Sequence, residues 1–430
     1  MPLITRDRAL LKSGLSGRLL QGCLNEHLRG TERLSRLRDA YLLRSAPEHP
    51  RRPQGLPDHR LRHAYVRYIV TIASSYLAGA AVSYQGEGPG ADALRRAYRD
   101  ANVAGADMEL ARQASLYGKG VEVIYADSRA RPRSAVLDPR CAFVVYADDA
   151  GAEPLFGVHF HPIVDESGAP RGYEAEVYTD TERITYRAAG YATLLRGAPI
   201  SRTPHYFGRL PLIEYWNNEE ETGDAEAVLS LIDAYDVLEE SRINDQEQLA
   251  DALLIVYGAR LETDEKGRTP AQQLQQDKLL YLPDRDAGAQ YLVKQSGAGA
   301  EELRRALERD IHKFSMIPDL SDEQFAGTVS GVAMKYKLLG LEQLTQLKER
   351  WFREALQERM RCYAHFLTVK GDRPLDESGL RVTFTRTLPE SALETAQMVK
   401  TLEGMVPDNI LLSQLPFLDG DKPETKQEVT

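Results

Sequence analysis

The chain has 430 residues, a formal net charge of -10 and a hydrophobic fraction of 42%. This length allows two or three domains, or one extended body with an insert, and the composition allows a sizeable core. The acidic balance argues against a general nucleic-acid coat, because tight DNA binding depends on basic surfaces that release counterions.

The first 57 residues predict a basic helical arm followed by a proline-rich linker. Leucines recur at helical spacing over residues 1–46, and arginines together with Lys12 form a basic face. Two interpretations remain open: the arm packs on its own domain or on a neighbour, or its basic face contacts DNA or an acidic partner. Charges in residues 6–12, with no apolar run after them, argue against a signal peptide.

Residues 58–223 predict an α+β domain that begins with helices. Helical patterns cover residues 58–78 and 91–117. Residues 68–86 carry no charge, but their hydroxyl side chains and glycines favour a buried helix and a short strand over a membrane span. Short alternating segments then predict an antiparallel meander. These segments begin at Val121, Ala142, Phe156, Tyr173 and Glu182.

The sequence predicts no metal, cofactor or catalytic residue. His159 and His161 share one face of a strand, but no third ligand follows nearby, so ordinary packing or surface histidines are expected. The turn 86–91 resembles a dinucleotide fingerprint only superficially, because Pro89 interrupts it and no parallel βαβ repeat surrounds it. Three cysteines without metal-type spacing indicate a reducing compartment.

Residues 224–251 predict a helix with an acidic face. Its carboxylates are Asp233, Asp236, Glu239, Glu240, Asp245 and Glu247. One interpretation is a solvated helix surface. The other is a wall that faces another polyanion: DNA carries one charge per ~1.7 Å of its axis, so a like-charged lining would repel it and let it slide.

A small α/β insert is expected at residues 252–299, between this helix and a returning helix at 300–317. Pro318 ends the returning helix, and a polar loop occupies residues 318–331. A second helix is predicted over residues 332–367, roughly 50 Å long at 1.5 Å per residue, with Gly340 as its kink site. Residues 368–392 contain a strand near Leu380 that returns to the earlier sheet, and residues 393–430 form a short final segment.

The chain resembles the portal proteins of tailed double-stranded DNA bacteriophages, in the branch named after the portal of phage SPP1. The resemblance rests on Phe325-Ala-Gly-Thr-Val-Ser-Gly331, on Ala333-Met-Lys-Tyr-Lys-Leu338 and on Pro211-Leu-Ile-Glu-Tyr-Trp-Asn-Asn-Glu219. Weaker similarities extend it in the expected order from about Leu61 to about Leu388. The basic first 50 residues are not part of it.

The resemblance implies a portal fold, with each predicted segment in a family role. Residues 58–223 would be the wing, and 224–251 and 300–317 the antiparallel stem helices. Residues 252–299 would be the clip, 318–331 the tunnel loop and 332–367 the long kinked helix behind it. Residues 368–392 would return to the wing, and 393–430 would form a reduced crown.

The resemblance also implies a mechanical function without catalysis. Copies of the chain would form a ring at one capsid vertex, and DNA would be packaged and ejected through its channel. The family's usual ring has twelve copies. Assembly would take place in the bacterial host cytoplasm. The implied partners are the terminase large subunit, a head-tail adaptor, and the major capsid and scaffolding proteins. The alternatives are a non-viral helical adaptor and, with less support, a hydrolase or nucleotide-dependent enzyme; no Walker A, G-x-S-x-G or H-E-x-x-H motif is present.

The expected site residues fall into three groups under this interpretation. The acidic helix would line the channel, and Lys335 and Lys337 are candidates for phosphate contacts, although packing or salt bridges between subunits remain open. The tunnel loop would approach DNA, with Phe325 as the best candidate for a constriction. Its residues are Asp322, Glu323, Gln324, Phe325, Ala326, Gly327, Thr328, Val329 and Ser330.

Overall fold

The computed structural model describes residues 3–11, 14–45, 57–250, 253–257, 263, 269, 288–292, 298–320, 331–372, 374, 380–386 and 400–401. The chain divides into two compact units. Unit 1 combines Met1–Arg44, Ala64–Ala227 and His312–Thr430, and unit 2 combines Ser45–His63 and Val228–Ile311. Both units are discontinuous in sequence, because residues 45–63 and 228–311 interrupt unit 1 and together form unit 2.

Two sheets form the centre of unit 1. The larger has the strand order β1-β5-β6-β7-β8-β9, antiparallel except for the parallel pair β1 and β5, and the smaller is the antiparallel sheet β10-β3-β4. Four of the five predicted segments, those from Ala142 onward, form an antiparallel meander in the larger sheet, whereas the segment at Val121 is β3 of the smaller sheet. The strands are β1 (Ile4–Arg6), β3 (Lys119–Ala126), β4 (Pro132–Leu137), β5 (Ala142–Ala147), β6 (Pro154–Val164), β7 (Pro170–Tyr178), β8 (Glu182–Ala188), β9 (Ser201–Pro204) and β10 (Leu212–Trp216).

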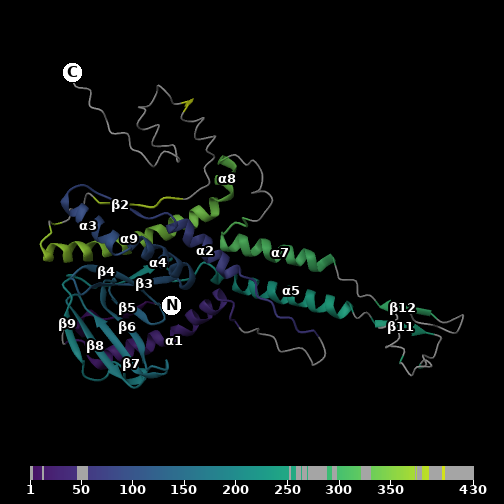
Figure 1. Ribbon diagram of the computed structural model, residues 1–430, viewed down its shortest axis with the longest axis horizontal. Helices are drawn as coiled ribbons and strands as arrows, with labels where there is room; N and C mark the ends of the chain where they lie inside the picture. The colour runs from purple at the N-terminus through teal and green to yellow at the C-terminus, as the bar shows by residue number, and fades with distance from the viewer. Residues whose placement is uncertain are drawn as a thin grey trace. The chain divides into compact units, whose positions relative to one another are not determined.

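Helices cover both outer faces of this sandwich, so unit 1 has four layers (Figure 1). The other described elements of unit 1 are η1 (Arg8–Leu11), α1 (Gly17–Tyr41), α2 (Tyr65–Ala78), β2 (Ser83–Gln85), α3 (Pro89–Asp100), α4 (Val103–Tyr117), η2 (Tyr191–Thr193), η3 (Glu226–Val228), α8 (Gly331–Lys337), α9 (Leu339–Lys370) and β13 (Arg381–Thr383).

Side-chain alternation along β5 explains how the layers are joined. Phe143 and Val145 point into the cluster beneath α1, whereas Val144 and Tyr146 point into the cluster between the sheets. A strand buried on both faces has apolar side chains throughout, as β5 does. Beyond the smaller sheet, Tyr215 packs in a third cluster with α9 and the helices α2 to α4.

The prediction of one helix over residues 1–46 is wrong at its start. Residues 4–6 form β1, which pairs with β5, and α1 begins only at Gly17. The Ser16 hydroxyl caps the helix by accepting a hydrogen bond from the backbone N–H of Leu19 at 3.2 Å. The inner face of α1 is buried on the larger sheet, so the arm belongs to its own domain.

The long helix is broken near its start. The structure ends α8 at Lys337 and begins α9 at Leu339, with Leu338 between them. The break therefore lies two residues before Gly340, the predicted kink site. Leu338 is buried, and its backbone ψ of 1° departs from the helical value.

The late strand returns to residues 58–223 as predicted, but it does not complete the meander sheet. β13 joins β2 in a two-stranded antiparallel ribbon and does not extend either of the two sheets. Leu380 packs against the cluster that contains α9.

In the residues that the structure describes, unit 2 contains two helices and a strand pair. They are α5 (Leu229–Ala250), β11 (Leu253–Tyr257), β12 (Gly288–Leu292) and α7 (Ala298–Ser315), whose residues up to Ile311 belong to this unit. β11 and β12 are antiparallel. The helix predicted from residue 58 does not begin there: residues 57–63 are extended and lie on α5, and α2 starts at Tyr65.

Candidate functional site

The acidic face of α5 binds an extended segment of its own unit, residues 57–63, which we call the strap. The backbone N–H groups of His59, Leu61 and His63 donate to Asn244 Oδ1 at 2.7 Å, Glu240 Oε1 at 2.9 Å and Asp236 Oδ1 at 3.0 Å. Alternate residues of an extended chain are about 6.6 Å apart, and a four-residue step along a helix is about 6 Å. The two spacings match, so the strap is held at three consecutive turns of α5.

Ion pairs reinforce these three hydrogen bonds. Arg62 pairs with Asp236 at 3.3 Å and with Glu240 at 3.5 Å, and His63 Nδ1 lies 2.6 Å from Asp236 Oδ1. Both carboxylates are 2% exposed. A residue that lines a channel has to be accessible, so the prediction of a lining role for Asp236 and Glu240 is replaced by a role in holding the strap.

The other four predicted lining residues lie nearer the surface of unit 2. Asp233 and Glu247 are exposed, and Glu239 and Asp245 are half-buried. Glu239 accepts a hydrogen bond from Arg242 at 2.7 Å, and Glu247 contacts the His59 ring. A lining role for these four remains a prediction.

Facing positions on α7 carry balanced charges. The Arg304 and Arg305 guanidiniums donate to Glu301 and lower the pKa of that carboxyl to about 2. Arg242 of α5 also reaches Glu301, at 3.2 Å. The described surface of α5 and α7 is therefore a network of paired charges rather than a uniformly negative wall.

The predicted tunnel-loop residues 322–330 lie outside the described residues. Of the two lysines after them, Lys335 is exposed and Lys337 is half-buried, both on α8. Tyr336 between them is 74% exposed. The prediction of phosphate contacts for both lysines stays a prediction.

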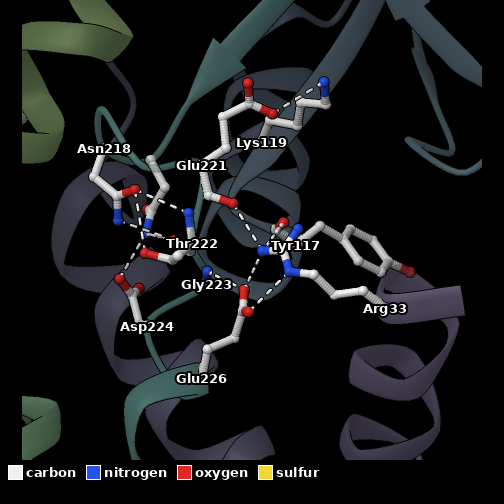
Figure 2. A network of polar contacts seen from close by, with 10 residues as sticks. Arg33, Tyr117, Lys119, Asn218, Glu221, Thr222, Gly223, Asp224 and Glu226 are labelled. Carbon is white, nitrogen blue, oxygen red and sulfur yellow. Dashed lines mark hydrogen bonds and ion pairs between the residues drawn. The ribbon is translucent and has the colours of Figure 1, made fainter. Parts of the chain in front are cut away.

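A network of polar contacts surrounds residues 217–226, immediately before α5 (Figure 2). Asp224 accepts hydrogen bonds from Ser115, from Lys348 of α9 and from Asn217. Lys348 and Asp224 are both almost fully buried, with side chains 3% and 1% exposed. The network joins α4, α9 and the chain that leads into α5.

Two glycines allow the backbone to turn so tightly in this network. Gly118 has a φ of +89°, and a Cβ there would lie 1.9 Å from the carbonyl oxygen of Glu221. A Cβ on Gly223 would lie 2.4 Å from the carbonyl oxygen of Leu116. Any side chain at either position would push the turn away from α4.

Arg33 extends the network to α1 (Figure 2). Its guanidinium donates to Glu226 and, at 2.8 Å, to the carbonyl oxygen of Glu221. Glu226 also accepts from the backbone N–H of Gly223 at 2.6 Å. At least one arginine of the basic arm therefore has a structural role inside unit 1.

Lys119 forms a second buried cluster of charged residues beside the turn, with Glu214 and Glu221. Its ammonium lies 2.9 Å from Glu214 and 3.3 Å from Glu221. Burial alone would lower the pKa of Lys119, but the two carboxylates raise it above its ordinary value. Burial raises the pKa of Glu221. The group ties β3 and β10 to the turn.

A third buried group lies on α9 and was missed at the sequence level. Arg359 pairs with Asp107 of α4 and donates to Glu122 of β3 at 2.8 Å. Tyr84 and Tyr215 donate their hydroxyls to the same carboxylates, at 3.0 and 2.6 Å. Burial raises the pKa of Asp107, and Arg359 opposes that effect. A charged residue in the apolar stripe of a helix, as Arg359 is, was the available signal.

The described residues contain no group of three or more histidine, cysteine, aspartate or glutamate side chains placed to hold a metal ion. His159 instead lies 3.6 Å from Glu176 and stacks on His161. Among the described helices, none is long and apolar enough to cross a bilayer. The uncharged segment forms α2 and β2, as predicted.

Comparison with known proteins identifies relatives over most of the chain. The family model described as "Phage portal protein, SPP1 Gp6-like" matches residues 20–429. The match includes most of α1, so the similarity begins earlier than residue 61.

Two portal proteins are among the relatives. That of Bacillus phage SPP1 is 24% identical over 387 residues, 85% of this chain and 75% of the relative. That of Clostridium phage phiCD119 is 23% identical over 246 residues, 57% of this chain and 53% of the relative.

Solved structures also align. The neck of an empty gene transfer agent (GTA) particle gives a TM-score of 0.45 at 15% identity, covering 82% of this chain and 90% of that one. The virion of a native GTA particle gives a TM-score of 0.44 at 14% identity, covering 89% of this chain and 92% of that one.

Proposed function

Because the chain belongs to the SPP1 Gp6-like family of phage portal proteins, we propose that its copies form a ring-shaped channel at one capsid vertex, through which double-stranded DNA is packaged and later ejected. The family match over residues 20–429 is the observation that carries this proposal. The ring acts mechanically, with no catalytic step of its own. The mixed α+β architecture agrees with it.

DNA contact is assigned to residues around the end of α7 and the start of α8. The loop 322–330 faces the DNA, Phe325 narrows the bore, and Asp322 and Glu323 keep it negative. Lys335 is the better of the two candidates for a phosphate contact, because its side chain is exposed whereas Lys337 is half-buried. On α5, the carboxylates left for the channel are Asp233, Glu239, Asp245 and Glu247.

The partners follow from the position of a portal in the particle. The clip at residues 252–299 contacts the terminase large subunit during packaging and the head-tail adaptor afterwards. The wing contacts the major capsid and scaffolding proteins. Assembly takes place in the bacterial host cytoplasm, and the ring is a dodecamer.

Electron microscopy of the purified full-length chain tests the proposal. Top-view class averages should show rings with a central hole as wide as duplex DNA. Adding purified scaffolding protein is a second condition, since assembly in solution can depend on it. Monomers or dimers alone, at high concentration and with scaffold present, would contradict the channel and favour a helical adaptor.

A further inference from the structure

Three arginines form a stripe on the outer face of α1. Arg18, Arg29 and Arg36 are all exposed. They are eleven and seven residues apart, which is about three and about two helical turns, so the stripe runs straight for roughly 27 Å. None of the three has an ion-pair partner among the described residues. Glu32 is the acidic residue between Arg29 and Arg36, and the face remains net positive.

Unit 1 also carries a groove with an aromatic wall, lined by residues of α9 and of both sheets. Its volume is about 720 Å³, and Tyr146, Trp216 and Trp351 line it. The two indoles lie 5.4 Å apart, and Tyr146 lies 5.6 Å from Trp216. The Tyr146 hydroxyl and the Trp216 N–H both donate to buried Glu214, so the ring surface that reaches the groove is apolar.

The groove is also acidic. Its lining includes five carboxylates and two arginines, namely Glu153, Asp180, Glu214, Glu354, Glu358, Arg209 and Arg361. Both arginines are already paired with Glu358. Asp180 and Glu354 are exposed and have no ion-pair partner within the described part of the chain. Guanidinium groups stack well on indoles and pair with carboxylates, so arginine is the side chain that this groove fits best.

One subunit cannot bring these two surfaces together. The inner face of α1 is fixed on the larger sheet, and α9, which supplies Trp351 and Glu354, is the outer layer on the other side of the sandwich (Figure 1). Two different, complementary surfaces at separate places on one subunit are what a head-to-tail contact requires, and such contacts form a ring when the rotation between copies closes. We infer that the arginine stripe of one copy docks along the tryptophan groove of the next copy.

This inference rests on the proposed ring and assigns one of its interfaces. Charge reversal tests it with the full-length chain. One variant carries R18E, R29E and R36E, and a second carries D180K and E354K. Each should reduce the fraction of protein in rings by about tenfold or more, measured by mass photometry and electron microscopy, because like charges then face each other. A single chain that carries all five changes should recover rings to within about twofold of wild type.

A matched control separates the interface from net charge. R96E, R99E and R171E reverse three exposed arginines elsewhere on unit 1, with the same change in charge, and should leave rings intact. Circular dichroism checks that every variant is folded. Rings at the wild-type level in both single-surface variants would overturn this inference and leave the channel standing. Rings that assemble normally with the stripe reversed but no longer retain DNA would instead assign the stripe to DNA and likewise overturn the inference. A wild type that never forms rings would overturn both.

Discussion

At the scale of single residues, buried ion pairs matter more to the stability of unit 1 than exposed ion pairs do. In the core, Arg359 and Lys119 each pair with two carboxylates and Lys348 pairs with one, and two of the three cations lie on α9. Breaking such a group leaves an uncompensated charge in a place without water, which is much more costly than losing a surface pair.

Arg359→Ala should therefore lower the free energy of unfolding by about 3–5 kcal/mol, because Asp107 and Glu122 would stay buried without their cation. Urea denaturation followed by circular dichroism measures the change. Arg361→Ala is the matched control, since its pair with Glu358 is partly exposed; it should cost less than about 1 kcal/mol. Equal losses of unfolding free energy in the two variants would contradict a stabilising role for the buried Arg359 ion pairs.

His27 should make stability depend on pH. Its ring is buried against Phe143, and burial lowers the pKa of His27 to about 3. In the unfolded chain the imidazole binds a proton near pH 6.5, so between these values the unfolded state binds more protons and stability falls as pH falls. The loss should reach about 2 kcal/mol by pH 5. Denaturation curves of His27→Phe should lack this slope, and those of the exposed His365→Phe should keep it.

At the scale of elements, the strap changes the meaning of the acidic helix. Asp236, Glu240 and Asn244 recur every four residues on α5 because they accept from alternate amides of an extended chain. A solvated or DNA-facing helix has no need of this regular spacing. The same three positions also explain why residues 58–63 are not helical: their amides are used by side chains of α5.

Asp236→Ala should release the C-terminal end of the strap from α5. It removes the acceptor of the His63 amide and one partner of Arg62. Hydrogen exchange of the amides at residues 59, 61 and 63 should then speed up by about tenfold or more. Asp233→Ala, at an exposed position of the same helix, serves as the control. Unchanged protection in Asp236→Ala would show that the strap is held by other contacts.

At the scale of the whole molecule, the exposed carboxylates of α5 are the ones to test for DNA passage. Asp233→Lys with Glu247→Lys should lower packaged DNA severalfold while rings still assemble, because attraction to phosphate would replace repulsion. Packaging in a reconstituted system, with ring counts by microscopy, measures both. Charge reversal at Asp236 or Glu240 would test folding instead, because both carboxylates are buried beneath the strap. Asp39→Lys with Glu87→Lys is a control at exposed sites of unit 1; normal packaging in the α5 variant would contradict a channel role for that face.

Much of the fold could be predicted from local pattern alone. Alternation placed the strands β3, β5, β6, β7 and β8, and helical spacing placed α5 and the combined span of α8 and α9 to within a few residues. The single helix predicted over residues 91–117 is divided into α3 and α4 at Asn102, which has a left-handed backbone conformation. The ordered motifs from residue 211 to residue 342 predicted the family, which the match over residues 20–429 confirms. These signals are local, because each depends on residues that are close in sequence.

The rest depended on contacts between distant residues, which a single sequence does not encode in any local period. Only the tertiary structure joins residues 4–6 to β5, and only the structure pairs β13 with β2. It also buries two of the six acidic residues of α5 under a strap 170 to 190 positions earlier in the chain. A carboxylate looks the same in sequence whether it faces water or an amide. The partner determines its role, and the partner is set by the fold.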